Sequence, residues 1–183
     1  MEKKYKTVIF DLDGTLLDTL DDLTASVNVA LKKHGLPLRS RDEVRRFVGN
    51  GVLLLMERAV PGGHGHPDFE QIYRDFREDY GLHCNDRTKP YPGIMALLGR
   101  LRARGYGLAI VSNKADFAVN TLREIYFDGL IDVAIGERET IRKKPAPDTV
   151  LAALDKLGAK AETAVYVGDS EVDLETAANV PMD

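Results

Sequence analysis

The 183-residue sequence contains one cysteine, Cys84, and no long apolar run. A single cysteine excludes an intrachain disulfide, and this usage is typical of a reducing cytosol. No stretch approaches the roughly 18 consecutive apolar residues that a membrane span needs. The opening residues, MEKKYKTVIF, pass from lysines straight into a short apolar run, unlike a signal peptide. We therefore expect a cytoplasmic protein with no membrane partner.

The sequence also lacks an excess of positive charge. Its formal net charge is −4 at pH 7, which gives no reason to expect nucleic acid as a partner. A charged small molecule stays compatible with this value, because local charge can oppose the net charge. The 44% hydrophobic and 30% charged residues are ordinary for a globular protein whose length allows one core and a sizeable insertion. The oligomeric state is left open.

Four short apolar runs predict strands that are covered on both faces. They are Val8 to Phe10, Leu108 to Val111, Ile131 to Ile135 and Ala164 to Val167. Runs of this kind suit a parallel sheet. Apolar residues with helical spacing precede each of the three later runs, at 94–101, 117–125 and 150–157. The alternation predicts an α/β fold with a doubly wound parallel sheet.

The first connection departs from this alternation. Between Thr15 and Tyr91 no segment predicts a strand, whereas apolar spacing predicts helices at about 20–31, 52–59 and 68–80. The polar, proline-containing segment CNDRTKPYPG then predicts a linker. We expect an α/β core domain from residues 1–17 and 84–183, and an inserted all-α cap domain from residues 18–83.

Acidic and polar residues follow the predicted strands. In chain order they are Asp11 and Asp13, Ser112 and Asn113, Lys144, and Asp169, Ser170 and Asp173. Ligands of an open parallel sheet bind beyond the carboxyl ends of its strands, so we expect these side chains to converge there.

The pair Asp11 and Asp13 raises an electrostatic problem. Two carboxylates about 5 Å apart repel by roughly 3 kcal/mol at an effective dielectric near 20. Three carboxylates with no nearby His or Cys suit Mg2+, which would offset this repulsion and make a bound phosphate electrophilic. Ser112 and the amides at the following helix start would hold phosphate oxygens, and Lys144 would supply a fixed positive charge.

Several of these residues also have a purely structural interpretation. The segment Ser170-Glu171-Val172-Asp173 fits a capping box, so Asp173 alone could cap a helix. Asn113 with Asp116 could do the same, and Lys144 could be a solvated lysine. Pro145, however, keeps Lys144 out of helical geometry. The order of the whole set at the strand ends favours a functional site.

The segments DLDGT, VSN, KKP and GDSEVD, in this order, resemble the four signature motifs of the haloacid dehalogenase superfamily. The resemblance spans the chain, and the helical insertion resembles the superfamily's small cap. It implies a Rossmann-like core, Mg2+, and phosphoryl transfer through an aspartyl-phosphate. Asp11 would be the nucleophile. Asp13 would protonate the leaving alkoxide and then activate water, a task that a dehalogenase does not require.

The resemblance also implies roles for the residues that bind phosphate. Ser112 would bind a phosphoryl oxygen, with Asn113 and Thr15 also on the substrate side. Lys144 would neutralise charge on Asp11 and on the phosphoryl group.

By the same resemblance, the metal ligands would be Asp169, a carboxylate oxygen of Asp11 and the backbone carbonyl of Asp13. Asp173 would orient the motif lysine or a metal-bound water, with Ser170 as a second supporting residue.

The cap segment RFVGNGVLLLMERAV is similar to that of the phosphoglycolate phosphatases. Its Asn50 and Gly51 would form a turn that contacts substrate, or only a turn between helices. We expect a Mg2+-dependent phosphatase of a small phosphorylated metabolite, with 2-phosphoglycolate as the best candidate. A β-phosphoglucomutase-like phosphomutase is an alternative. A receiver-like phospho-signalling domain fits less well, because its phosphoacceptor follows the third strand, where this sequence has Gly136.

The sequence ends at Asp183, where the resemblance implies a further strand and helix. The core is therefore expected to lack its last strand–helix unit. The run from Ala164 to Val167 would then be an edge strand with one unpaired ladder, unless something else covers that edge.

Overall fold

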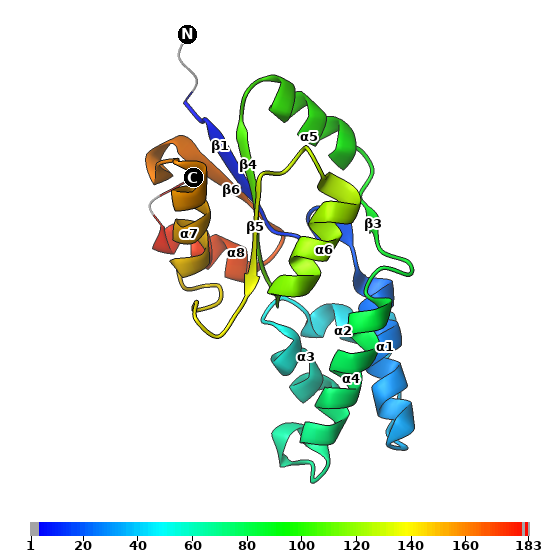
Figure 1. Cartoon of the computed structure of the whole chain (residues 1–183). Helices are drawn as coiled ribbons and strands as arrows, with labels where there is room; N and C mark the ends of the chain where they lie inside the picture. Colours follow the sequence, from blue (N-terminus) through cyan, green and yellow to red (C-terminus); the bar gives the residue numbers. More distant parts are fainter. Residues whose placement is uncertain (1–3, 181, 183) are drawn as a thin grey trace. The chain divides into compact units, whose positions relative to one another are not determined.

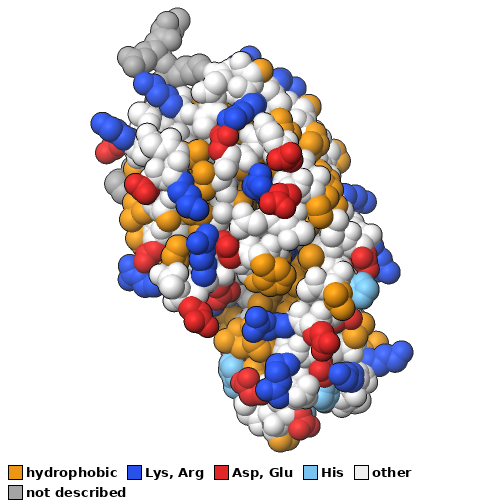
Figure 2. Space-filling model, viewed as in Figure 1, with side chains coloured by type: hydrophobic (Ala, Val, Ile, Leu, Met, Phe, Trp, Pro, Cys, Tyr) orange, Lys and Arg blue, Asp and Glu red, His pale blue; other side chains and the backbone are white. Residues whose placement is uncertain are grey.

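The computed structural model of the protein describes residues 4–180 and 182. The chain divides into two compact units. The first holds the described residues of Met1–Leu17 and Pro90–Asp183, and the second is Asp18–Lys89 (Figure 1). Charges of both signs are interspersed over the face drawn in Figure 2, in keeping with the net charge of −4.

The first unit is built on a four-stranded parallel sheet. The strand order is β5 (Val133–Glu137), β4 (Gly107–Ala115), β1 (Thr7–Phe10) and β6 (Ala164–Val167). The four predicted strands are thus confirmed. The strand β5 begins two residues later than the predicted Ile131, whose amide still bonds to Phe127 O at the end of the preceding helix.

Alternate side chains of the strands face opposite layers of helices. Phe10 and Ile110 lie in one core with α5 (Ile94–Ala103) and α6 (Asp116–Phe127). Ile9 lies in the other core with α7 (Asp148–Leu157), and α8 (Glu171–Asn179) adds Ala177 at its margin. Helices therefore cover both faces of the sheet, as the doubly wound prediction requires.

The strand β6 lies at an edge of this sheet. Within the described residues it pairs with β1 and with no other strand. Val167, at its carboxyl end, is 38% exposed, so this edge is open to solvent there. The predicted edge position of the strand is confirmed.

The second unit is helical. It contains α1 (Leu20–Lys33), α2 (Arg41–Phe47), α3 (Val52–Ala59), a short 3-10 turn (Gly63–Gly65) and α4 (Phe69–His83). Buried Val27, Leu31, Ile72 and Phe76 belong to its own core. Among the described residues, no helix is long and apolar enough to cross a membrane.

Two features of this region correct the sequence-based expectation. The sequence predicts no strand between Thr15 and Tyr91, yet β2 (Leu17–Asp18) and β3 (Lys89–Pro90) pair in a two-stranded sheet. Each has two residues, too few for a periodic apolar pattern. The helix α2 was not predicted either, although Ser40 and Glu43 form a capping box at its start.

Candidate active site

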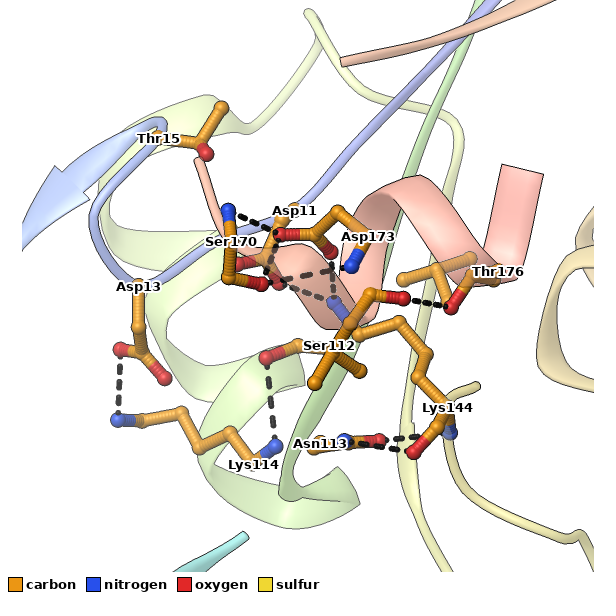
Figure 3. A network of polar contacts seen from close by, with 12 residues as sticks. Asp11, Asp13, Thr15, Ser112, Asn113, Lys114, Lys144, Ser170, Asp173 and Thr176 are labelled. Carbon is orange, nitrogen blue, oxygen red and sulfur yellow. Dashed lines mark hydrogen bonds and ion pairs between the residues drawn. The ribbon is translucent and has the colours of Figure 1, made fainter. Parts of the chain in front are cut away.

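Polar side chains gather at the carboxyl ends of the central strands (Figure 3). Asp11 directly follows β1, and its amide donates to Val167 O of β6 at 2.9 Å. The last residues of β4 include Ser112 and Asn113, which are both buried. The parallel strands thus bring together residues from distant parts of the chain, as expected for a doubly wound sheet.

Lys144 is the centre of this cluster and is only 3% exposed. Its ammonium donates to Asp11 Oδ1 at 2.8 Å, to Asp173 Oδ1 at 2.7 Å and to the Tyr166 hydroxyl at 3.1 Å. The three protons of the ammonium thus have three acceptors. The Tyr166 hydroxyl in turn donates to Asp173 Oδ1 at 3.0 Å. Charge and hydrogen bonding are therefore closely matched around the lysine.

Asn113 fixes the backbone of Lys144. Its Oδ1 accepts from Lys144 N at 2.8 Å, and its Nδ2 donates to Lys144 O at 3.0 Å. Asn179 of α8 donates to the next carbonyl, Pro145 O, at 2.9 Å. Asn113 was expected on the substrate side, but these bonds give its amide a positioning task that the sequence did not indicate.

Asp173 contacts Lys144 and also takes part in a helix cap. Ser170 Oγ donates to Asp173 Oδ2 at 2.6 Å, and the two residues form a capping box at the start of α8. The other oxygen, Oδ1, accepts from Lys144. A helix cap therefore also holds the carboxylate beside the lysine.

Asp169 lies against the loop that follows β1. Thr15 Oγ1 donates to Asp169 Oδ1 at 3.1 Å, so the predicted substrate-side threonine here supports the carboxylate. Gly14 has φ +89°, and a Cβ built there would lie 2.3 Å from Asp169 Oδ2. A side chain at position 14 would be strained and would displace this carboxylate.

Two residues of the cluster were missed by sequence reasoning. The Lys114 ammonium donates to Asp13 Oδ1 at 3.0 Å, while its amide donates to Ser112 Oγ at 3.2 Å. The other missed residue is Tyr166, whose contacts are given above. A lysine directly after VSN, and a tyrosine inside the apolar run of β6, were the available signals.

The acidic groups could hold a cation. Carboxylate oxygens of Asp11, Asp169 and Asp173 all lie within 4.8 Å of one another. Both oxygens of Asp173 already accept hydrogen bonds, from Lys144 and Ser170, so Asp11 and Asp169 are the better candidates. An all-oxygen set of this kind fits Mg2+ or a similar hard cation.

Burial and charge act against each other in this cluster. Burial raises the pKa of Asp11 to about 7, although Lys144 opposes the shift. Burial alone would lower the pKa of Lys144, but Asp11, Tyr166 and Asp173 together carry it above its usual value. Burial likewise works against ionisation of Asp173, yet Lys144 and the hydrogen bonds bring that pKa below the ordinary range. Added positive charge would therefore favour ionised Asp11.

Asn50 and Gly51 belong to the second unit, directly before α3. Gly51 is the N-cap residue of this helix, with φ +88°. The contact of these two residues with substrate stays a prediction.

The fold and the cluster define the class of protein. Residues 8–183 match the family model described as haloacid dehalogenase-like hydrolase. The chain therefore belongs to the haloacid dehalogenase-like hydrolase family.

Named relatives narrow the class further. The chain is 35% identical over 172 residues to a phosphoglycolate phosphatase of Aquifex aeolicus, covering 93% of this chain and 78% of that protein. It is 34% identical over 183 residues to a phosphoglycolate phosphatase of Nitrosococcus oceani, covering 97% and 81%. An N-acetylmuramic acid 6-phosphate phosphatase of Pseudomonas aeruginosa is 30% identical over 174 residues, covering 94% and 77%.

A solved structure supports the same placement. A crystal structure from Lactobacillus delbrueckii subsp. bulgaricus, assigned by prediction to the phosphoglycolate phosphatases, has a TM-score of 0.93 and 37% identity. It covers 98% of this chain, which spans 84% of that one. Together, family and relatives identify a phosphoric monoester hydrolase.

Proposed function

We propose that the protein is a Mg2+-dependent phosphatase that hydrolyses a small phosphorylated metabolite through an aspartyl-phosphate on Asp11. The observation that carries this proposal is the buried Lys144 ammonium, 2.8 Å from Asp11 Oδ1. It holds the carboxylate at the end of β1 and places a positive charge where a phosphoryl group would arrive. Phosphoryl transfer depends mainly on such positioning and charge neutralisation.

Asp11 acts as the nucleophile in the first half of the reaction. Lys144 engages Oδ1, and Oδ2 has no protein partner among the described residues. A bond forms between a carboxylate oxygen of Asp11 and phosphorus as the bond from phosphorus to the leaving oxygen breaks. Asp13 gives its proton to that oxygen, so the alcohol departs neutral.

Water completes the reaction in the second half. Asp13, now ionised, takes a proton from the attacking water. The oxygen of this water bonds to phosphorus as the bond between phosphorus and the Asp11 carboxylate breaks. The oxygen of the Ser112 hydroxyl accepts a hydrogen bond from the Lys114 amide. The hydroxyl proton of Ser112 is therefore available to donate to a phosphoryl oxygen. Splitting the displacement into two steps is the advantage of covalent catalysis.

Asp11, Asp169 and the backbone carbonyl of Asp13 would hold the cation. When bound, Mg2+ would offset the repulsion between the carboxylates and draw charge from a phosphoryl oxygen. The hydrogen bond from Thr15 keeps Asp169 turned toward this position.

The substrate we propose is 2-phosphoglycolate, because two relatives at 34–35% identity carry the name phosphoglycolate phosphatase. N-acetylmuramic acid 6-phosphate is the second candidate, since a relative at 30% identity is named N-acetylmuramic acid 6-phosphate phosphatase. A phosphomutase would return the phosphoryl group to a bound sugar rather than to water.

The helical unit is proposed to be the cap, with Asn50 and Gly51 as candidate substrate contacts. We further infer a cytoplasmic protein without nucleic-acid or membrane partners, on the basis of the net charge of −4 and the single cysteine.

The test is release of inorganic phosphate from a panel holding 2-phosphoglycolate and several sugar phosphates, with and without EDTA. We expect fastest release from 2-phosphoglycolate, and loss of activity in EDTA that added Mg2+ restores. An Asp11→Asn variant is the control, and equal turnover by this variant would reject the covalent mechanism. Conversion of a sugar phosphate into its isomer without phosphate release would favour the mutase.

A further inference from the structure

Lys114 has a buried ammonium to which the mechanism above assigns no part. Only 1% of its side chain is exposed, and its Nζ lies 3.0 Å from Asp13 Oδ1. Lysine is rarely buried in this way unless it is paired with an acid. The acid that it meets is the residue proposed to exchange protons with substrate and water.

The backbone of Lys114 is firmly held. It lies in β4, next to the strand that leads into Asp13, and its amide bonds to Ser112 Oγ at 3.2 Å. Behind it, a Cβ built on Gly136 would lie 2.6 Å from Lys114 O, so β5 packs against this backbone as closely as glycine allows. The ammonium therefore projects from a fixed base rather than from a loose loop.

The lysine engages one oxygen of the carboxylate. Asp13 Oδ1 accepts from Lys114, whereas Oδ2 has no protein partner among the described residues. A carboxylate held by one oxygen has a defined orientation for the other. A general acid or base must lie within hydrogen-bond reach of the atom that it serves, so this orientation matters for rate.

We propose that Lys114 is a positioning residue for Asp13: it fixes Oδ1 and so directs Oδ2 at the reacting oxygen. This inference rests on the proposed function. In the first half-reaction the proton on Oδ2 passes to the leaving oxygen. In the second half-reaction Oδ2 takes the proton of the attacking water. Lys114 keeps all of its protons throughout.

The test compares two kinds of leaving group in the variant Lys114→Met. An alkoxide needs a proton to depart, whereas p-nitrophenolate does not. With an alkyl phosphate we expect kcat to fall about 10- to 100-fold while KM changes less than about threefold. In single-turnover release of p-nitrophenolate from p-nitrophenyl phosphate, we expect a change of less than about threefold. The control Lys156→Met removes the same charge from an exposed position on α7 and should leave both rates unchanged.

A double variant sharpens the test. If Lys114 acts through Asp13, the two substitutions should not add. Turnover of the alkyl phosphate by the double variant Lys114→Met with Asp13→Asn should then be close to that of Asp13→Asn alone. An equal fall in rate with both leaving groups would overturn the inference. It would mean that the lysine instead contacts the phosphoryl group or only stabilises the fold. Unchanged turnover of the alkyl phosphate would overturn it too.

Two further controls keep the result interpretable. If Lys114→Met does not fold, Lys114→Gln, which keeps a donor without the charge, is compared in the same way. A parent protein that releases no phosphate from any substrate would reject the proposed function itself. That result differs from an active parent whose rates do not respond to Lys114→Met.

Discussion

Buried carboxylates in the two units of this protein have opposite environments. In the helical unit, Asp75 of α4 accepts from Lys33, His34 and Gln71, at 2.9, 2.7 and 3.0 Å. These hydrogen bonds lower the pKa of Asp75 to about 2, and those from Lys33 and His34 contribute most. At the strand ends of the other unit, burial raises the pKa of Asp11 to about 7 despite its bond to Lys144.

The difference separates a structural ion cluster from a reactive one. Asp75 is stabilised as a carboxylate by groups of its own unit, and nothing further is needed to satisfy it. Among the described residues, the side chain of Asp11 accepts a hydrogen bond from Lys144 alone, and it lies close to the carboxylates Asp169 and Asp173. Sites that keep unfavourable electrostatics in a folded chain are candidates for function, because a bound ligand can complete them.

The largest expected effect is that of Asp11→Asn. Removing the nucleophile should lower phosphate release on the order of 10⁴-fold or more. Because an amide avoids the cost of burying a charge, the melting temperature should be equal to or higher than that of the parent. Calorimetry beside the activity assay checks both parts. A clear loss of stability would mean that Asp11 resembles Asp75 more closely than the comparison allows.

A smaller effect is expected from Asp169→Asn. The variant should need about 10- to 100-fold more Mg2+ for half-maximal activity, because a neutral amide is a poorer ligand for a hard cation. A Mg2+ titration of phosphate release measures this change. Added Mg2+ should also raise the melting temperature of the parent more than that of the variant. An unchanged titration would remove Asp169 from the metal site.

Asp75→Asn should affect stability and leave the chemistry intact. The free energy of unfolding should fall by about 1.5–3 kcal/mol, the value of hydrogen bonds to a charged group. Since the folded pKa of about 2 lies below the ordinary value of 3.8, this contribution is complete above about pH 4. It should disappear as the pH falls through about 2. Urea unfolding of both proteins at several pH values checks the sign, and a difference that grew on acidification would contradict it.

Much of this arrangement could be predicted from the sequence, and the limits are physical. Asp11, Lys144 and Asp173 were recognised because each follows or adjoins an apolar run or a proline, which are local signals. The shortest elements could not be predicted from the sequence: α2 has seven residues, and β2 has two. Such lengths carry too little periodicity to be detected.

Side-chain contacts between residues far apart in the sequence were the other feature that could not be predicted. The contact of Lys114 with Asp13 joins residues 101 positions apart, and the bonds from Asn113 to the backbone of Lys144 span 31. Both depend on how the strands and the loop before α7 lie against one another. Residue types and local spacing carry no information on this arrangement. The sequence motifs therefore predicted which residues form the site, but not the hydrogen bonds between them.

The smallest effect is expected from Tyr166→Phe. The hydroxyl accepts from Lys144 at 3.1 Å and donates to Asp173 at 3.0 Å, yet these two groups also bond directly to each other at 2.7 Å. Burial raises the pKa of Tyr166, so the hydroxyl stays protonated and able to donate. Losing it should cost about 1 kcal/mol of stability and less than about tenfold in kcat. A fall in kcat of clearly more than about tenfold would show that the tyrosine, rather than the direct ion pair, holds Lys144 in place.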